Sequence, residues 1–278
     1  MNRINEVFDE LKREGRKALI CFITLGYPDL KSTEELIFEF EKRGVDIIEL
    51  GIPFSDPLAD GPVIQYSSQE ALRKGVSLKK AVEFVKKVRR KTSIPLVFMG
   101  YYNPIFKFGE KLFIDKALEA GVDGLILADL PPEEAGNIIP YARERNFPLI
   151  FLLTPVSSDY RIKLICRVSE GFVYCVSYTG VTGRGYREED LLRKFIKKTR
   201  SYTEVPLCIG FGISSPFDAE KLSSFADGVI VGSAIIKRIR ENENREDMIY
   251  RVGEFVLSLS RAIRKNSLKD IPEPPSLD

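Results

Sequence analysis

The stretch VDIIELGIPFSDPLADGP, residues 45–62, joins a short apolar run to a long loop that is rich in proline and acidic residues. The β-branched residues of the run predict a buried strand, and Glu49 lies inside it. A buried carboxylate is costly in free energy unless it is paired or used in chemistry. Glu49 therefore requires a structural or a functional explanation.

Apolar runs of the same kind recur along the whole chain, and charged segments with helical spacing separate them. One such segment, residues 77–91, places Leu78, Val82, Val85 and Val88 on one face. Strand and helix alternate eight times, which predicts an α/β fold, a single (β/α)8 TIM barrel. A doubly wound sheet is the alternative, but no GxGxxG motif follows the first strand. The predicted strands are ALICFITLG, VDIIELGIP, PLVFMGYY, VDGLILADLP, PLIFLLTP, GFVYCVSYTG, PLCIGFGI and DGVIVGS.

Two shorter segments flank the predicted barrel, which spans residues 17–265. Residues 1–16 carry an apolar stripe and predict an extra N-terminal helix that covers one barrel end. Residues 266–278 contain three prolines and little to bury, so we expect a flexible C-terminal tail. The long loop after strand 2, between Gly51 and Gly75, exceeds an ordinary strand-to-helix connection, which is typical of a functional loop.

Composition excludes several classes of protein. A net charge of +2 gives no reason to expect nucleic acid as a partner. The sequence lacks a signal peptide and an apolar run of membrane-spanning length, so we expect a cytoplasmic protein. The four cysteines are scattered and histidine is absent, so we expect no bound metal.

The acids near the predicted strand ends are the first candidates for catalysis. In a barrel strand alternate residues point inward, which places Ile47, Glu49 and Gly51 inside, near the C-terminal mouth. Apolar walls would raise the pKa of Glu49 and suit it to proton transfer, although a bond to a loop amide would also explain it. The residues alone rank Glu49 first. They leave three aspartates level, since each has an ordinary role in a turn or a helix cap: Asp56, Asp60 and Asp129.

Caps are also expected on two later helices. Asp159 is placed to cap the segment YRIKLICRV, and Ser214 or Ser215 the segment PFDAEKLSSF. Asp129 is placed to cap a helix that begins at Pro131 or Pro132.

Glycine-rich loops follow the last strands and suggest a phosphate site. Gly212 and Gly232 lie 20 residues apart, one βα unit, so both can reach the same rim, and Ser233 adds a hydroxyl. Tight turns are the alternative explanation of these glycines. The loop TGVTGRGYREED has the composition of a lid. Because no predicted strand contains a lysine, a Schiff-base aldolase is not expected.

Six motifs in the same order resemble the tryptophan synthase α subunit family, over residues 18–236. The motifs are FITLGYPD, ELGIPFSDPLADGPVIQ, MGYYNPI, ADLPPEE, FVYCVSYTGVTGRG and GFGIS with ADGVIVGSAI. The resemblance implies a carbon–carbon lyase that cleaves indole-3-glycerol phosphate, by a retro-aldol reaction, to indole and D-glyceraldehyde 3-phosphate. Protonation of indole C3 would then supply the electron sink that neither lysine nor metal provides.

The resemblance also implies roles for individual residues. Glu49 matches the family's general acid–base, and Asp60 matches the carboxylate that holds the indole N–H. Thr182 matches the threonine of the lid. The matched phosphate-binding residues are Gly183, Gly212, Gly232 and Ser233, and the matched indole-pocket residues are Phe22, Ile64, Leu127, Tyr174 and Phe211. Packing in the barrel core is the alternative explanation of the apolar ones.

A partner is implied as well. The family works with a β subunit, in an α2β2 tetramer, that receives indole and carries pyridoxal phosphate, so we expect no cofactor in this chain. Two other functions stay open on the residues. One is another phosphate-binding barrel, such as an indoleglycerol phosphate synthase, which needs a strand lysine, or a phosphoribosyl isomerase. The other is a non-catalytic α subunit that only activates its partner.

Overall fold

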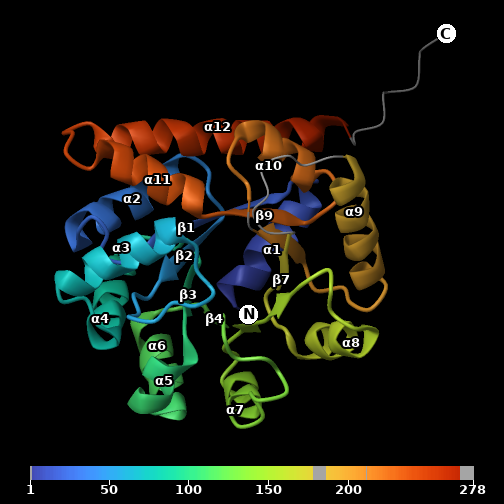
Figure 1. Cartoon of the computed structure of the whole chain (residues 1–278), viewed down its shortest axis with the longest axis horizontal. Coiled ribbons are helices and arrows are strands. Elements are labelled where there is room, and N and C mark those ends of the chain that lie inside the picture. The colour runs from blue at the N-terminus through green and yellow to red at the C-terminus, as the bar shows by residue number, and fades with distance from the viewer. Residues whose placement is uncertain (1, 178–185, 211, 270–278) are drawn as a thin grey trace.

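The strands of the chain form one parallel barrel surrounded by helices (Figure 1). The computed structural model describes residues 2–177, 186–210 and 212–269. The strand order is β5-β4-β3-β2-β1-β9-β8-β7-β6, and every neighbouring pair is parallel. The strands are β1 (Ala18–Thr24), β2 (Ile47–Gly51), β3 (Leu96–Gly100), β4 (Gly124–Leu127), β5 (Leu149–Ile150), β6 (Leu152–Leu153), β7 (Val173–Val176), β8 (Leu207–Gly210) and β9 (Gly228–Val231).

Strands β5 and β6 are the two halves of the fifth predicted strand, and they close the barrel. Only Phe151 separates them. The first half pairs with β4 and the second half pairs with β7. The predicted (β/α)8 barrel is thereby confirmed, with all eight apolar runs in its wall.

Helices cover the outside of the barrel because each one carries a single apolar face. In α4, Ser77 caps the first turn and accepts a hydrogen bond from Lys80 N, while Phe84, Val85 and Val88 are buried. None of the described helices combines the length and the apolarity needed to span a membrane. The helices are α1 (Arg3–Arg13), α2 (Leu30–Lys42), α3 (Pro62–Arg73), α4 (Leu78–Val88), α5 (Tyr102–Phe108), α6 (Glu110–Ala120), α7 (Ile138–Glu144), α8 (Asp159–Val168), α9 (Tyr186–Arg200), α10 (Pro216–Ser223), α11 (Ser233–Asn242) and α12 (Met248–Lys269).

Helix α1 lies against the N-terminal ends of the strands. Ile4 is fully buried, and its side chain occupies the space beside Gly124 and Gly171, where an added Cβ would come within 3.1 Å and 3.2 Å of it. Arg3 also forms an ion pair of 2.8 Å with the buried Asp123. This packing leaves the opposite, C-terminal end of the barrel available for a site. At the other end of the chain α12 runs to Lys269, and residues 270–278 lie outside the described residues.

Two of the three predicted caps differ in the structure. Ser158, not Asp159, caps α8, because its side chain accepts a hydrogen bond from Arg161 N and Asp159 is already helical. Asp129 accepts a hydrogen bond of 2.8 Å from Tyr102 N and so serves the start of α5. No helix begins at Pro131 or Pro132, since turns follow and α7 starts only at Ile138. Ser215 caps α10 as predicted, in a capping box with Asp218.

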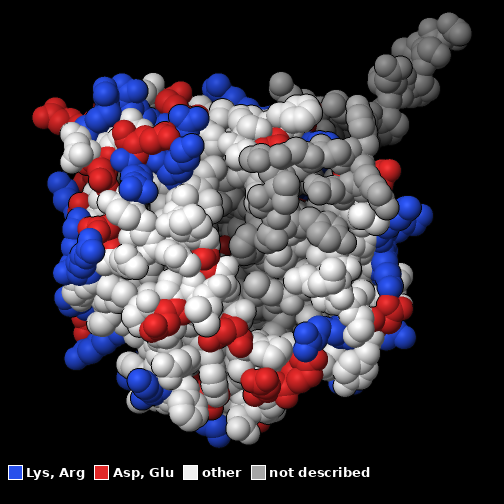
Figure 2. All heavy atoms as spheres, in the orientation of Figure 1, with Lys and Arg blue, Asp and Glu red and all other residues white. Residues whose placement is uncertain are grey.

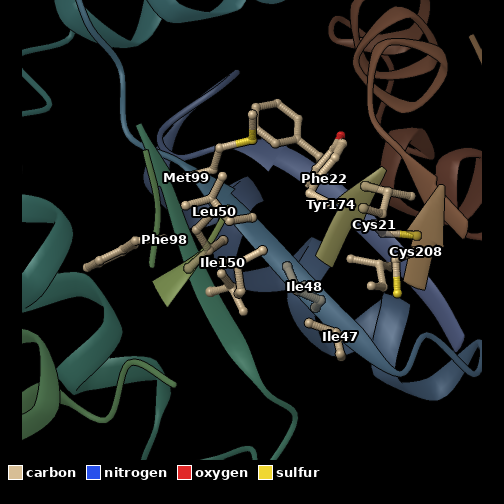
Figure 3. Packing of buried hydrophobic residues seen from close by; sticks show 14 of the residues in the cluster. Cys21, Phe22, Ile47, Ile48, Leu50, Phe98, Met99, Ile150, Tyr174 and Cys208 are labelled. Carbon is tan, nitrogen blue, oxygen red and sulfur yellow. The ribbon is translucent and has the colours of Figure 1, made fainter. Parts of the chain in front are cut away.

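The register of the barrel decides which side chains point inward. Phe22 pairs with Glu49, and Glu49 with Val97, so these three residues share one face. Phe98 lies on the other face, where it points away from the barrel and stacks on Phe113 of α6 with ring centroids 6.2 Å apart (Figure 3). Glu49 therefore points into the barrel, as the alternation predicts.

Candidate active site

A cavity of about 710 Å³ opens at the C-terminal ends of the strands. Its base is formed by Phe22, Glu49 and Tyr174, from three different strands. Figure 3 shows Phe22, Met99 and Tyr174 together at one end of the strands, with Ile47 and Ile48 further along. This is the end of a (β/α)8 barrel at which active sites are found.

Glu49 is the buried acid of this cavity. It is 0% exposed, and in the described part of the chain neither of its carboxylate oxygens has a hydrogen-bond partner. Burial raises the pKa of Glu49 from its ordinary value to about 8. At neutral pH the side chain is therefore mostly protonated, and it can donate a proton to a bound molecule.

The raised pKa of Glu49 makes stability depend on pH, and Glu49→Gln should remove this dependence. The folded chain binds a proton that the unfolded chain releases between its ordinary pKa of 4.5 and about 8. The unfolding free energy of the wild type should therefore decrease as the pH rises through this range, whereas glutamine does not titrate. We expect Glu49→Gln to gain stability relative to the wild type between pH 5 and pH 9, measured by urea denaturation.

The comparison between the two proteins isolates Glu49. Asp46 is a partly buried acid whose pKa burial raises to about 6, but it titrates in both proteins and cancels from the difference. A stability difference that stays constant from pH 5 to pH 9 would contradict a raised pKa at Glu49.

Asp60 faces the same cavity from the loop before α3. Its carboxylate accepts a hydrogen bond from the Tyr101 hydroxyl, which itself accepts one of 3.0 Å from Ala59 N. Burial raises the pKa of Asp60, and the bond from Tyr101 opposes that rise. Tyr101 thus fixes both the backbone and the carboxylate of this part of the loop.

The loop that carries Asp60 is held by a ring stack with Tyr101 and by hydrogen bonds to α3. The Tyr101 ring stacks on Phe54 with centroids 5.3 Å apart. Phe54 N donates a hydrogen bond of 2.9 Å to the Ser68 hydroxyl, and that hydroxyl donates one of 3.1 Å to Phe54 O. Because Ser68 belongs to α3, the loop is tied to the helix that follows it.

The structure distinguishes the three aspartates that the residue pattern alone left level and of which the family resemblance selected Asp60. Asp60 lines the cavity, whereas Asp56 is exposed and accepts a hydrogen bond from the neighbouring Ser55 hydroxyl. Asp129 is engaged at the start of α5. The role of Tyr101 was not foreseen, although it lies within the motif MGYYNPI; its partner Ala59 is 42 residues away in the sequence.

The opposite side of the cavity is built from backbone. Gly212 has a φ of +70°, which favours glycine, and lies in the loop after β8. Gly232 precedes the first turn of α11, where a Cβ would come within 3.3 Å of Phe22, and Ser233 begins that helix. The first N–H groups of a helix have no acceptor within it, so this turn offers donors to an anion in the cavity.

The remaining predicted site residues fall into three groups. Ile64 and Tyr174 line the cavity with Phe22. Leu127 differs from its expected place, because it pairs with Gly100 while its neighbour Ile126 pairs with the cavity residue Met99. Alternate residues of a strand point to opposite faces, so Leu127 faces the helices. Three predicted residues lie outside the described residues: Thr182, Gly183 and Phe211.

The sequence patterns did not predict that charged residues of α11 lie at the mouth of the cavity. Lys237, Arg238 and Glu241 all line it. The available signal was the helical spacing of four residues between Ser233 and Lys237. Within the described ranges, no cluster of three or more His, Cys, Asp or Glu side chains could hold a metal.

The chain is a closed parallel barrel with a buried carboxyl group of raised pKa at its C-terminal mouth. These features define the class of (β/α)8-barrel enzymes that use acid–base chemistry. The family model described as tryptophan synthase alpha chain matches residues 8–264. The chain therefore belongs to the tryptophan synthase alpha chain family.

Individual relatives agree with the family match. The chain is 50% identical to the tryptophan synthase alpha chain of Thermoanaerobacter sp. over 263 residues, which are 95% of this chain and 100% of the relative. It is 47% identical to the alpha chain of Geotalea uraniireducens over 264 residues, 95% of this chain and 98% of the relative. The crystal structure of the alpha subunit from Legionella pneumophila superposes with a TM-score of 0.89 at 37% identity, covering 95% of this chain and 99% of that one.

The family fixes the reaction. The chain is a carbon–carbon lyase of tryptophan biosynthesis that cleaves indole-3-glycerol phosphate to indole and D-glyceraldehyde 3-phosphate, and the indole passes to a β subunit.

Proposed function

We propose that Glu49 is the general acid–base of this cleavage and that Asp60 is the carboxylate that binds the indole N–H. The observation that carries the proposal is the fully buried carboxyl of Glu49, which has no hydrogen-bond partner among the described residues and whose pKa burial raises to about 8. Asp60 lines the same cavity with Tyr101 as its hydrogen-bond donor. One acid that is mostly protonated and another whose hydrogen bond favours ionisation suit two different roles.

The proposed steps balance without a cofactor. Glu49 donates its proton to indole C3, and the ring becomes an indoleninium cation that Asp60 stabilises through the ring N–H. Glu49, now ionised, takes the proton of the glycerol hydroxyl next to the ring. The C–C bond breaks as the aldehyde forms, and its electron pair returns to the ring. Glu49 ends the cycle protonated, as it began.

The substrate phosphate is assigned to the backbone side of the cavity. Gly212, Gly232 and Ser233 line that side, at the start of α11. A helix N-terminus with glycine loops is a common phosphate site of barrels. Gly183 and the lid residue Thr182 are assigned to the same ligand on the resemblance to the family alone, as is Phe211 to the indole pocket.

The proposal also includes a partner subunit and a cellular compartment. We assign the chain to an α2β2 tetramer whose β subunit alone carries pyridoxal phosphate, in the cytoplasm, where buried thiols such as Cys21 stay reduced. Leu58, in the loop before α3, and Phe106, on α5, are 93% and 62% exposed near Asp60 and Tyr101, which suits docking there. Figure 2 shows acidic and uncharged residues over much of this face, with lysines and arginines mostly toward its edges.

The direct test is release of indole from indole-3-glycerol phosphate, with and without a β subunit, as a function of pH. Because Glu49 must begin protonated in the free enzyme, kcat/KM should fall as the pH rises through about 8. Indole and glyceraldehyde 3-phosphate should appear in equal amounts. Stimulation of the β subunit without any cleavage would contradict the proposal, and so would a rate that is flat to pH 10.

A further inference from the structure

The cations around the cavity lie on one side of it, and two of its three acids lie on the other. Among the described residues that line it, the cations are Lys237 and Arg238, and both belong to α11. Of the lining acids, Glu49 and Asp60 lie on the side of β2 and the following loop, and Glu241 lies on α11 beside the cations. The substrate phosphate carries close to two negative charges at neutral pH. The cations therefore stand on the side that can attract it.

Lys237 is placed over the first turn of α11. It follows Ser233 by four residues, so both side chains lie on one face of the helix. Long side chains on a helix lean toward its N-terminus and cover the preceding turn. The Lys237 side chain therefore leaves the helix on the side of Ser233. In this structure its ammonium group lies beside Glu241, and a change of rotamer would bring it toward Ser233 and the N–H groups beside it.

The contacts of the two cations separate their roles. Lys237 Nζ lies 3.9 Å from Glu241 Oε1, with side chains 69% and 46% exposed, which is a weak and replaceable contact. The Arg238 guanidinium lies 5.1 Å above the Phe255 ring of α12 and is also 4.0 Å from Glu241. Arg238 is held toward α12, whereas Lys237 can exchange its carboxylate for a phosphate.

We propose that Lys237 binds the phosphate of the substrate and sets the direction in which the substrate enters the cavity. This rests on the phosphate location in the proposed function. The ammonium group adds a full positive charge to the backbone donors of α11. A substrate bound in the reverse direction would bring its phosphate to Glu49 and Asp60, away from this charge.

The test compares Lys237→Gln, Lys237→Arg and Lys31→Gln with the wild type, as full chains with a β subunit present. Lys31 is the matched control, because it forms the same exposed i,i+4 pair, 3.7 Å from Glu35, on α2. For Lys237→Gln we expect KM to rise about tenfold with kcat within about twofold, since the lost interaction is present throughout the reaction. The KM of the variant should also respond less to added salt. Lys237→Arg should retain most of the affinity, and Lys31→Gln should match the wild type.

Titration with inorganic phosphate separates this proposal from the assigned reaction, because it needs no turnover. Phosphate should bind Lys237→Gln about tenfold more weakly than the wild type. If the wild type cleaves its substrate but Lys237→Gln has unchanged KM and phosphate affinity, the role of Lys237 is wrong and the function stands. If phosphate binding needs Lys237 but no cleavage occurs, the residue roles under the proposed function are wrong and the Lys237 site stands. If Lys237→Gln and Lys31→Gln lose phosphate affinity equally, the change in net charge explains the effect and the proposal is wrong.

Discussion

Glu49→Gln is expected to reduce indole release by about 10³-fold while the chain stays folded. Glutamine has the size of the protonated acid that occupies this buried position, so the packing around it can be retained. It can neither give a proton to indole C3 nor take one from the glycerol hydroxyl. The loss should appear in kcat, because the proton is transferred only in the reaction itself.

The measurement is the steady-state rate of indole formation at saturating β subunit. Glu35→Gln is the control, since it makes the same chemical change at a side chain of α2 that is 46% exposed. The control should match the wild type, and inorganic phosphate should bind Glu49→Gln normally. A folded Glu49→Gln that releases indole at the wild-type rate would remove Glu49 from the mechanism.

Asp60→Asn is expected to reduce cleavage by about 10²-fold to 10³-fold. The carboxylate is assigned to the positive charge that develops on the indole ring, and a neutral amide cannot stabilise that charge. Burial makes this interaction stronger than it would be in water. Tyr101→Phe should show a smaller loss, about tenfold, because it keeps the stack on Phe54 and removes only the hydroxyl that positions Asp60.

Asp56→Asn is the matched control for Asp60, four residues earlier in the same loop and exposed. Rates should be compared at saturating β subunit, so that a change in docking does not alter them. We expect the control to cleave at the wild-type rate. If Asp56→Asn and Asp60→Asn lose activity equally, the loop as a whole matters and the assignment to one carboxylate is wrong.

The sequence was sufficient to predict the barrel and the inward position of Glu49, because both follow from the regular spacing of apolar residues along the chain. Eight apolar runs with charged helical segments between them predict a parallel barrel. A period of two then places Glu49 inside, near the mouth. Leu127, assigned to the pocket by the match to the family, shows how sensitive such a match is, since a shift of one position moves a side chain to the other face.

The residue pattern alone did not separate the three aspartates; the resemblance to the family selected Asp60, and the tertiary structure shows the contacts of each. The local sequence signals are equivalent for all three aspartates, but their contacts differ. Asp56 contacts Ser55, Asp60 contacts Tyr101, and Asp129 contacts Tyr102. The α8 cap is a similar case, in which Ser158 and Asp159 are both good candidates and the backbone selects Ser158.

The sequence by itself determined the class of fold, the family and the buried acid. The resemblance in the sequence also selected Asp60, and the tertiary structure decided that Tyr101 holds this side chain at the cavity and that Lys237 stands at the other side. The physical reason is that strand and helix patterns are set by neighbouring residues. The direction of a loop side chain is set by partners such as Ala59 and Tyr101, which lie 42 residues apart and meet only when β2 and β3 pair.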